Sequence, residues 1–261
     1  MIKKFSDLLN ESWIEYKANF KMILKVFTLL AVIPALILFF YIGIDYSNGS
    51  IRIESFEQIK NLGAIALSSM IILSLIANIL SVLMKGTFIS AFFSEKATKK
   101  ASDAIKEGLN YLPGLIGLAV VMIAALIPLY ILLIIPGVIF TIYWAFSAYI
   151  LIGENKGIIE SLKASFNLVK GKWWKVFGYL LLILLVLICI SVLIMIPGFI
   201  ILKLIELIIS KNIMYDLTSE IINLGIALIT TPLLTIFMKN FYLELKSGKV
   251  KGKKWKTKTK R

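Results

Sequence analysis

The residues that could do chemistry are few, and none of them forms a recognised catalytic or metal-binding pattern. Histidine, the commonest general base and metal ligand, is absent from the 261 residues. The single cysteine, Cys189, lies in an apolar run and is expected to behave as a small hydrophobic residue. No serine lies in a nucleophile-elbow motif, and residues 153–157 lack the glycine spacing of a phosphate-binding loop. We therefore expect no catalytic residue, metal site or cofactor, and a protein that is not an enzyme.

Polar side chains inside the long apolar runs are the remaining candidates for a site. Two of them are amides, Asn78 and Asn223, and the others are serines and threonines. Ionisable residues within membrane spans usually mark ion paths or proton relays, and the apolar cores hold none. The expected role of both amides is hydrogen bonding between helices, and a polar site between the second and sixth spans is the alternative.

The elements that position these residues are long apolar runs. Hydrophobic residues make up 59% of the chain and its mean hydropathy is +0.89, whereas soluble domains are nearer half apolar. About 20 residues cross a hydrocarbon core as a helix, so the sequence predicts an all-α integral membrane protein with six spans. The expected spans are Met22–Ile44, Leu62–Met84, Leu115–Ile135, Val138–Ile152, Val176–Ile196 and Ile221–Met238.

Three Pro-Gly pairs are expected to mark helix boundaries. Pro136-Gly137 separates the third and fourth spans, which predicts a tight hairpin, with one long kinked helix as the alternative. Pro113-Gly114 is expected to end the preceding amphipathic helix. Pro197-Gly198 is expected to close the fifth span, and residues 199–209 are then too short to cross and are predicted to lie at the interface.

Three amphipathic stretches share one face with the same six-position spacing, typical of a helix lying on a membrane surface. They are Phe5–Tyr16, Ala101–Leu112 and Ile158–Val169. Apolar spans follow each of them, so we expect a threefold internal repeat within one membrane domain, residues 1–245. The repeats cover residues 5–93, 101–152 and 158–245, and residues 246–261 form a basic tail.

The three stretches also agree residue by residue. The fourth position of the shared face is small each time, and the fifth is large. Small residues let helix backbones approach closely, so we expect the small ones to lie against membrane helices while the large ones reach beneath the headgroups. Ordinary amphipathic periodicity is the simpler interpretation. The small residues are Ser12, Gly108 and Ser165, and the large ones are Trp13, Leu109 and Phe166.

Positive charge predicts the orientation. With six spans and a cytoplasmic N-terminus, the four cytoplasmic segments hold five, five, five and ten of the 29 basic residues, and the other side holds four. Because lysine and arginine concentrate in cytoplasmic loops, we expect a multi-pass protein of the cell (inner or plasma) membrane with both termini in the cytoplasm.

Basic and aromatic residues at the expected interface predict contact with lipid. Lys170 and Lys172 precede Trp173 and Trp174, a combination typical of membrane–water interfaces. The tail, with Lys253, Lys254 and Trp255, favours anionic lipid at the cytoplasmic face, while a simple solubility tail is the alternative. Nucleic acid is disfavoured as a partner because the tail has no recognition motif. A protein partner stays open.

The central stretch resembles a broad group of prokaryotic membrane proteins that includes the membrane domain fused to some glycerophosphodiester phosphodiesterases. The resemblance implies an architecture but no catalysis, since that chemistry belongs to a separate soluble domain. The residues that carry it are Ile135-Pro136-Gly137, Trp144, Tyr149, Glu154, Ser161, Ser165, Lys170-Gly171 and Trp173-Trp174.

The sequence as a whole favours a non-enzymatic membrane protein that organises lipid or a partner protein at the cytoplasmic leaflet. The alternative is a transporter or permease component for an uncharged or zwitterionic substrate, which would need a mid-membrane cavity near Asn78 or Asn223.

Overall fold

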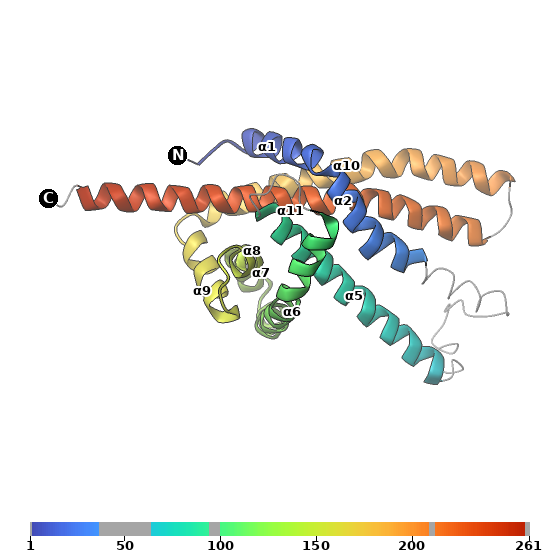
Figure 1. Ribbon diagram of the computed structural model, residues 1–261, viewed down its shortest axis with the longest axis horizontal. Coiled ribbons are helices and arrows are strands. Elements are labelled where there is room, and N and C mark those ends of the chain that lie inside the picture. Colours follow the sequence, from blue (N-terminus) through green and yellow to red (C-terminus); the bar gives the residue numbers. More distant parts are fainter. Residues whose placement is uncertain (1, 37–63, 94–99, 209–211, 259–261) are drawn as a thin grey trace.

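All elements in the described part of the computed structural model, residues 2–36, 64–93, 100–208 and 212–258, are helical (Figure 1). The chain is therefore all-α, as predicted. The helices are α1 (Phe5–Ala18), α2 (Phe20–Phe27), the π-helical turn η1 (Thr28–Val32), α5 (Ala64–Phe93), α6 (Ala101–Leu132), α7 (Ile134–Tyr143), α8 (Ser147–Gly153), α9 (Ile158–Val169), α10 (Trp173–Ile208) and α11 (Asn212–Lys258).

Five of these helices, or helix pairs, are long and apolar enough to cross a membrane, and a sixth span results if the bent pair Phe5–Ala18 and Phe20–Leu36 counts as one. The bend between the two parts of that pair is 71°. The chain is therefore a multi-pass membrane protein by the length and composition of its helices. The expected first span, Met22–Ile44, extends beyond residue 36 and so lies partly outside the described residues.

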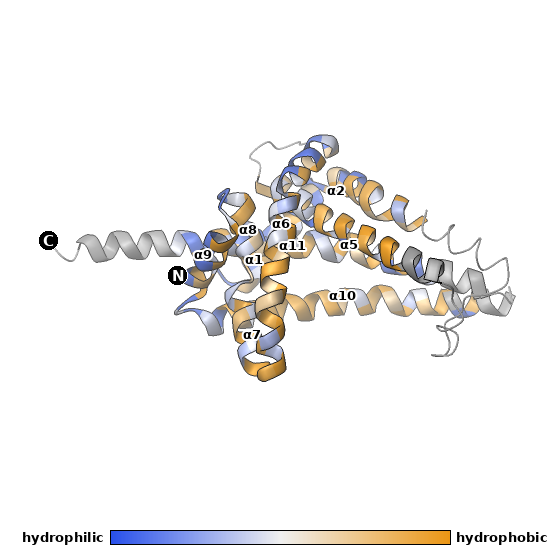
Figure 2. Cartoon of the chain, turned by 90° about the horizontal axis from the view of Figure 1, so that it is seen from below, coloured by the Kyte–Doolittle hydropathy of each residue, from blue (hydrophilic) through white to orange (hydrophobic). Residues whose placement is uncertain are grey.

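The longest helices, α10 and α11, run side by side along the long axis of the molecule in both views (Figures 1 and 2). Aromatic side chains fill the core where α11 meets α5 and the start of α8. Phe88, Phe146 and Phe241 are fully buried, and the rings of Phe146 and Phe241 pack edge to face with 5.6 Å between centroids. This core lies at the end of the bundle where α1 and α9 also gather.

The predicted hairpin between the third and fourth spans is present. The break is a single extended residue, Leu133, with φ −156° and ψ 123°. Pro136 then occupies the first turn of α7, where a missing N–H costs no intrahelical hydrogen bond. The hydroxyls of Tyr130 and Thr141 are 2.9 Å apart across the hairpin, which fixes the antiparallel arrangement of α6 and α7.

This hairpin runs crosswise to α10 and α11 in Figure 2 and is seen nearly end-on in Figure 1. Its tip, residues 131–135, consists of five apolar residues that are each at least 64% exposed. A water-exposed surface rarely carries such a contiguous apolar patch, so the tip requires an apolar environment.

None of the three Pro-Gly pairs marks a helix end as predicted. The α6–α7 break lies at Leu133, so Pro136-Gly137 falls inside α7. Pro113-Gly114 does not end a short amphipathic helix, because α6 continues through it to Leu132. Pro197-Gly198 does not close the fifth span, and the predicted interfacial helix after it belongs to α10 as far as Ile208. A proline removes one backbone hydrogen bond, but neighbouring helices compensate in apolar surroundings, so a proline is a weaker stop signal here than in a soluble helix.

The fourth span and the tail also differ from the expectation. A turn at Trp144–Phe146 divides the fourth span into α7 and α8. The expected boundary between the membrane domain and the basic tail at residue 245 falls inside α11, which continues to Lys258.

Candidate functional site

The last helix, α11, forms an ion pair with the N-terminal helix in which the lysine is buried. The Lys239 side chain is only 8% exposed, and its ammonium contacts the Glu15 carboxylate of α1 and lies 3.3 Å from the Phe92 carbonyl oxygen of α5. The neighbouring Asn240 amide donates hydrogen bonds of 3.2 Å to Glu15 Oε2 and to Ser12 Oγ. Because these groups come from opposite ends of the chain, the cluster fastens α1 to α11.

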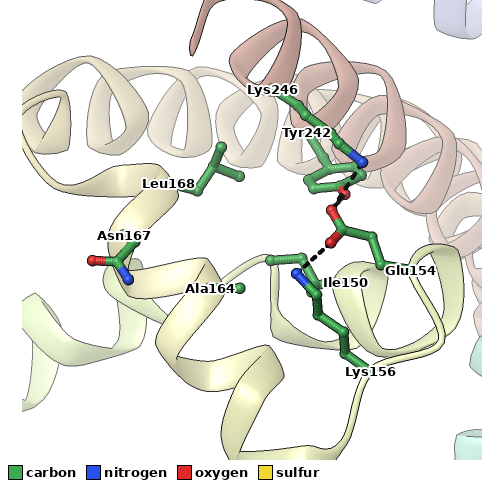
Figure 3. A pocket seen from close by; sticks show the side chains of 8 residues that line it. All are labelled: Ile150, Glu154, Lys156, Ala164, Asn167, Leu168, Tyr242 and Lys246. Atoms are coloured by element: carbon green, nitrogen blue, oxygen red, sulfur yellow. Dashed lines mark hydrogen bonds and ion pairs between the residues drawn. The ribbon is translucent and has the colours of Figure 1, made fainter. Parts of the chain in front are cut away.

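A second glutamate, Glu154, contacts α11 about two turns further along that helix. Glu154, just after α8, accepts hydrogen bonds from Lys156 at 2.6 Å and from Lys246 at 2.9 Å, and also from the Tyr242 hydroxyl (Figure 3). Partial burial on its own raises the pKa of the Glu154 carboxyl, but these three donors outweigh it and lower the pKa to about 2. Glu154 therefore stays ionised at neutral pH.

Beside this second cluster lies a pocket of about 270 Å³. Figure 3 shows that its walls come from α9, from the end of α8 and from α11, so segments distant in sequence build it. Its polar side holds the Glu154 cluster, and its other lining residues are Ile150, Ala164, Asn167 and Leu168.

Ser165 holds the break between α7 and α8. Its hydroxyl donates a hydrogen bond of 2.7 Å to the Tyr143 carbonyl and accepts one of 3.2 Å from the Phe146 amide. These backbone groups lie at the turn between the two helices and lack regular helical partners there. One buried serine of α9 thus satisfies both sides of the turn.

The other two small residues of the shared face are buried as well. Ser12 donates to the Leu8 carbonyl at 2.7 Å and accepts from Asn240 of α11. Gly108 of α6 lies so close to α5 that a Cβ atom there would come within 2.9 Å of the Thr87 backbone. Each of the three thus contacts a different neighbouring helix or turn.

The predicted interfacial aromatic residues are only partly covered. Trp13 stacks on Tyr16 with 5.3 Å between ring centroids, and Phe166 packs on Tyr143 at 4.3 Å. Trp173 donates a hydrogen bond from Nε1 to the Ile139 carbonyl at 3.3 Å, whereas Trp174 is 78% exposed. Lys170, at the end of α9, is exposed and Lys172 is half-buried, so Lys170 and Trp174 face outward on either side of the α9–α10 connection.

The glycines of two Pro-Gly pairs mark close contacts. A Cβ atom on Gly137 would lie 2.6 to 2.8 Å from the Tyr130 ring, so this glycine, next to Pro136, permits the tight hairpin. Gly198, next to Pro197 within α10, similarly faces Ile222 of α11 at 2.6 Å. Both pairs lie where two helices approach each other.

The two intramembrane amides are not brought together. Asn78 is exposed and donates to the Ser74 carbonyl of its own helix at 2.8 Å, and Asn223 is also exposed. The pocket described above lies elsewhere, at the polar end of the bundle. The side chains of Lys253, Lys254 and Trp255 lie outside the described residues, although the helical backbone of α11 passes through them.

The sequence pattern does not predict the two clusters. Glu154 is only one of the residues that carry the resemblance, and Lys156, Glu15 and Lys239 belong to no expected site. One signal existed for Lys239, because it is a single lysine between the apolar run Leu233–Met238 and the aromatic residues Phe241 and Tyr242. No group of three His, Cys, Asp or Glu residues that could hold a metal ion occurs within the described ranges.

The chain belongs to the family defined by a domain of unknown function, DUF7847, whose model matches residues 59–244. The matched region contains α5 to α10 and most of α11, and thus Glu154, Lys156 and Tyr242, but neither Lys246 nor α1. No curated protein and no solved structure matches the chain. These comparisons give no link to the glycerophosphodiester phosphodiesterases.

Proposed function

We propose that this chain is a non-enzymatic membrane protein that organises lipid, or a partner protein, at the cytoplasmic leaflet. The observation that carries the proposal is the unequal distribution of charge. The two ionic clusters lie where α1 and the α8–α9 connection meet α11, and hydrophilic residues gather there and at the start of α6, whereas α7, α10 and much of α5 are apolar (Figure 2).

The charged end is proposed to face the cytoplasm, with both termini on that side of the cell membrane. The excess of lysine in the corresponding segments supports this orientation through the positive-inside rule. Trp174 and Lys170 then lie at headgroup depth, and the basic end of α11 faces anionic lipid. The apolar tip of the α6–α7 hairpin is proposed to contact acyl chains.

A threefold repeat is the proposed plan of this domain. Its support is the order of contacts: α1 packs on α11 through Ser12, α6 packs on α5 through Gly108, and α9 packs on the α7–α8 turn through Ser165. In each case an amphipathic segment contacts the span that precedes it, with α11 preceding α1 cyclically. The relation to phosphodiesterase-fused membrane domains is kept as a proposal about architecture only.

Lipid analysis of native membrane particles tests the function. The protein is extracted from membranes with a styrene–maleic acid polymer, and its lipids are compared with those of the whole membrane. We expect anionic phospholipid to be enriched, because the charged end attracts it. A lipid composition equal to that of the bulk membrane, with no co-purifying protein, would contradict the proposal.

Cysteine labelling tests the orientation. In a Cys189→Ala background, Glu160→Cys lies on the proposed cytoplasmic side and Arg52→Cys on the other. A membrane-impermeant maleimide added to intact cells should label only the cysteine at position 52. Labelling of position 160 instead would reverse the orientation.

A further inference from the structure

The pocket beside Glu154 combines an apolar wall with a pair of lysines. Ile150, Ala164 and Leu168 contribute the wall, and Lys156 and Lys246 stand at its polar side (Figure 3). Both lysines are accessible, with side chains 39% and 50% exposed, so an incoming ligand can reach them. This differs from Lys239, which is enclosed.

Glu154 holds the two lysines in place and offsets only one of their two positive charges. Its carboxylate accepts one hydrogen bond from each ammonium, and each ammonium has three N–H donors, so each retains donors for a further acceptor. Two positive charges and one ionised carboxylate leave one net positive charge beside the pocket. The Tyr242 hydroxyl also donates to Glu154, which leaves the carboxylate poorly placed to interact with a cation beyond the two lysines.

From this geometry we propose that the pocket binds the phosphodiester group of an anionic phospholipid. A phosphodiester carries one negative charge, which matches the net charge of the cluster, and its oxygens accept charge-assisted hydrogen bonds from lysine. The apolar wall suits the glycerol and the first carbons of the acyl chains. Glu154 directly follows the apolar helix α8, which places the cluster at headgroup level in the proposed orientation. The inference rests on the proposed function and names its lipid site.

The test uses the full-length protein in detergent, titrated with dioleoyl phosphatidylglycerol and followed by native mass spectrometry. The double variant Lys156→Gln/Lys246→Gln removes the pocket charges. The control Lys106→Gln/Lys163→Gln removes the same charge from exposed lysines outside the pocket. We expect the pocket variant to bind the first lipid about 10- to 30-fold more weakly than wild type, and the control to bind it about as well as wild type.

Two further measurements separate the explanations. Lys156→Arg/Lys246→Arg keeps the charge and should retain binding, and the circular dichroism of every variant shows whether it is folded. Inorganic phosphate at matched concentration should not displace the lipid, because it lacks the apolar part. Displacement by inorganic phosphate would overturn the lipid assignment, and equal binding by folded pocket and control variants would overturn the site.

Failure of the proposed lipid site can be distinguished from failure of the proposed function. If the native membrane particles are enriched in anionic lipid while the pocket variant binds the first lipid normally, the site assignment fails and the function stands. If enrichment is absent as well, both fail.

Discussion

Two lysines of α11, Lys239 and Lys246, lie seven residues apart on one face of the helix, and each meets a glutamate from another segment. The two glutamates are similarly exposed, but Lys239 is buried, whereas Lys246 is half exposed and shares Glu154 with Lys156 and Tyr242. The same pair of residue types thus occurs in two different environments on one helix.

The difference in lysine burial determines which of the two clusters can bind a ligand. A buried ion pair is stabilising mainly in the sense that removing one partner leaves an uncompensated charge. An exposed pair contributes little to stability, but its donors stay within reach of solvent, lipid or a partner. The Lys239 cluster is therefore assigned to folding, and the Lys246 cluster to binding.

The largest expected effect comes from breaking the buried pair. Glu15→Leu removes the carboxylate that pairs with Lys239. Among the described residues, the Phe92 carbonyl is then the remaining hydrogen-bond partner of this ammonium. We expect a loss of about 3 kcal/mol in the free energy of unfolding, measured by denaturant titration in mild detergent. The matched control is Glu11→Leu on the same helix. Glu11 forms a solvent-exposed ion pair with Lys3, so its loss should lower the free energy of unfolding by less than about 0.5 kcal/mol.

Replacing both members of the buried pair is the second test. Glu15→Leu/Lys239→Met exchanges two charges for apolar side chains of similar length. We expect it to recover most of the stability lost in Glu15→Leu and to lie within about 1 kcal/mol of wild type, because no uncompensated charge remains. A double variant no more stable than the single one would show that the pair itself, rather than the orphaned lysine, matters.

Parts of this comparison could be read from the sequence. The bounds of α9, Ile158 to Val169, coincide with those of the predicted stretch, because a helical period is a local property of the sequence. The start of α1 at Phe5 follows in the same way. The prediction that the Pro-Gly pairs end helices failed, because the effect of a proline on a helix depends on its environment and on neighbours such as Ile222 beside Gly198.

The two clusters could not be predicted, since their partners are distant. Glu15 and Lys239 are 224 residues apart, and the contact depends on how α1 docks on α11. Glu154 and Tyr242 are 88 residues apart. A lysine near an apolar run shows that a partner is needed, but not which carboxylate supplies it.

The third prediction concerns acid stability. The folded protein holds the Glu154 pKa at about 2, below the ordinary 4.5. A depressed folded-state pKa contributes stability above pH 4.5 that is lost as the pH falls toward 2. Because solvent screens this partly exposed carboxylate, we expect ionised Glu154 to contribute about 1 kcal/mol to the free energy of unfolding. Glu154→Gln should therefore be less stable than wild type at pH 7 and closer to it at pH 3, measured by unfolding at both values. A constant difference would contradict the role of these donors.

The smallest expected effect separates stability from binding most sharply. Lys246→Met removes a half-exposed lysine, and Glu154 keeps its hydrogen bonds from Lys156 and Tyr242. We therefore expect less than about 0.5 kcal/mol of change in unfolding free energy, together with weaker binding of phosphatidylglycerol. A variant as destabilised as Glu15→Leu would place Lys246 with Lys239 among the structural residues. Since the two lysines lie on one face of one helix, unequal effects on folding follow from their burial rather than from their chemistry.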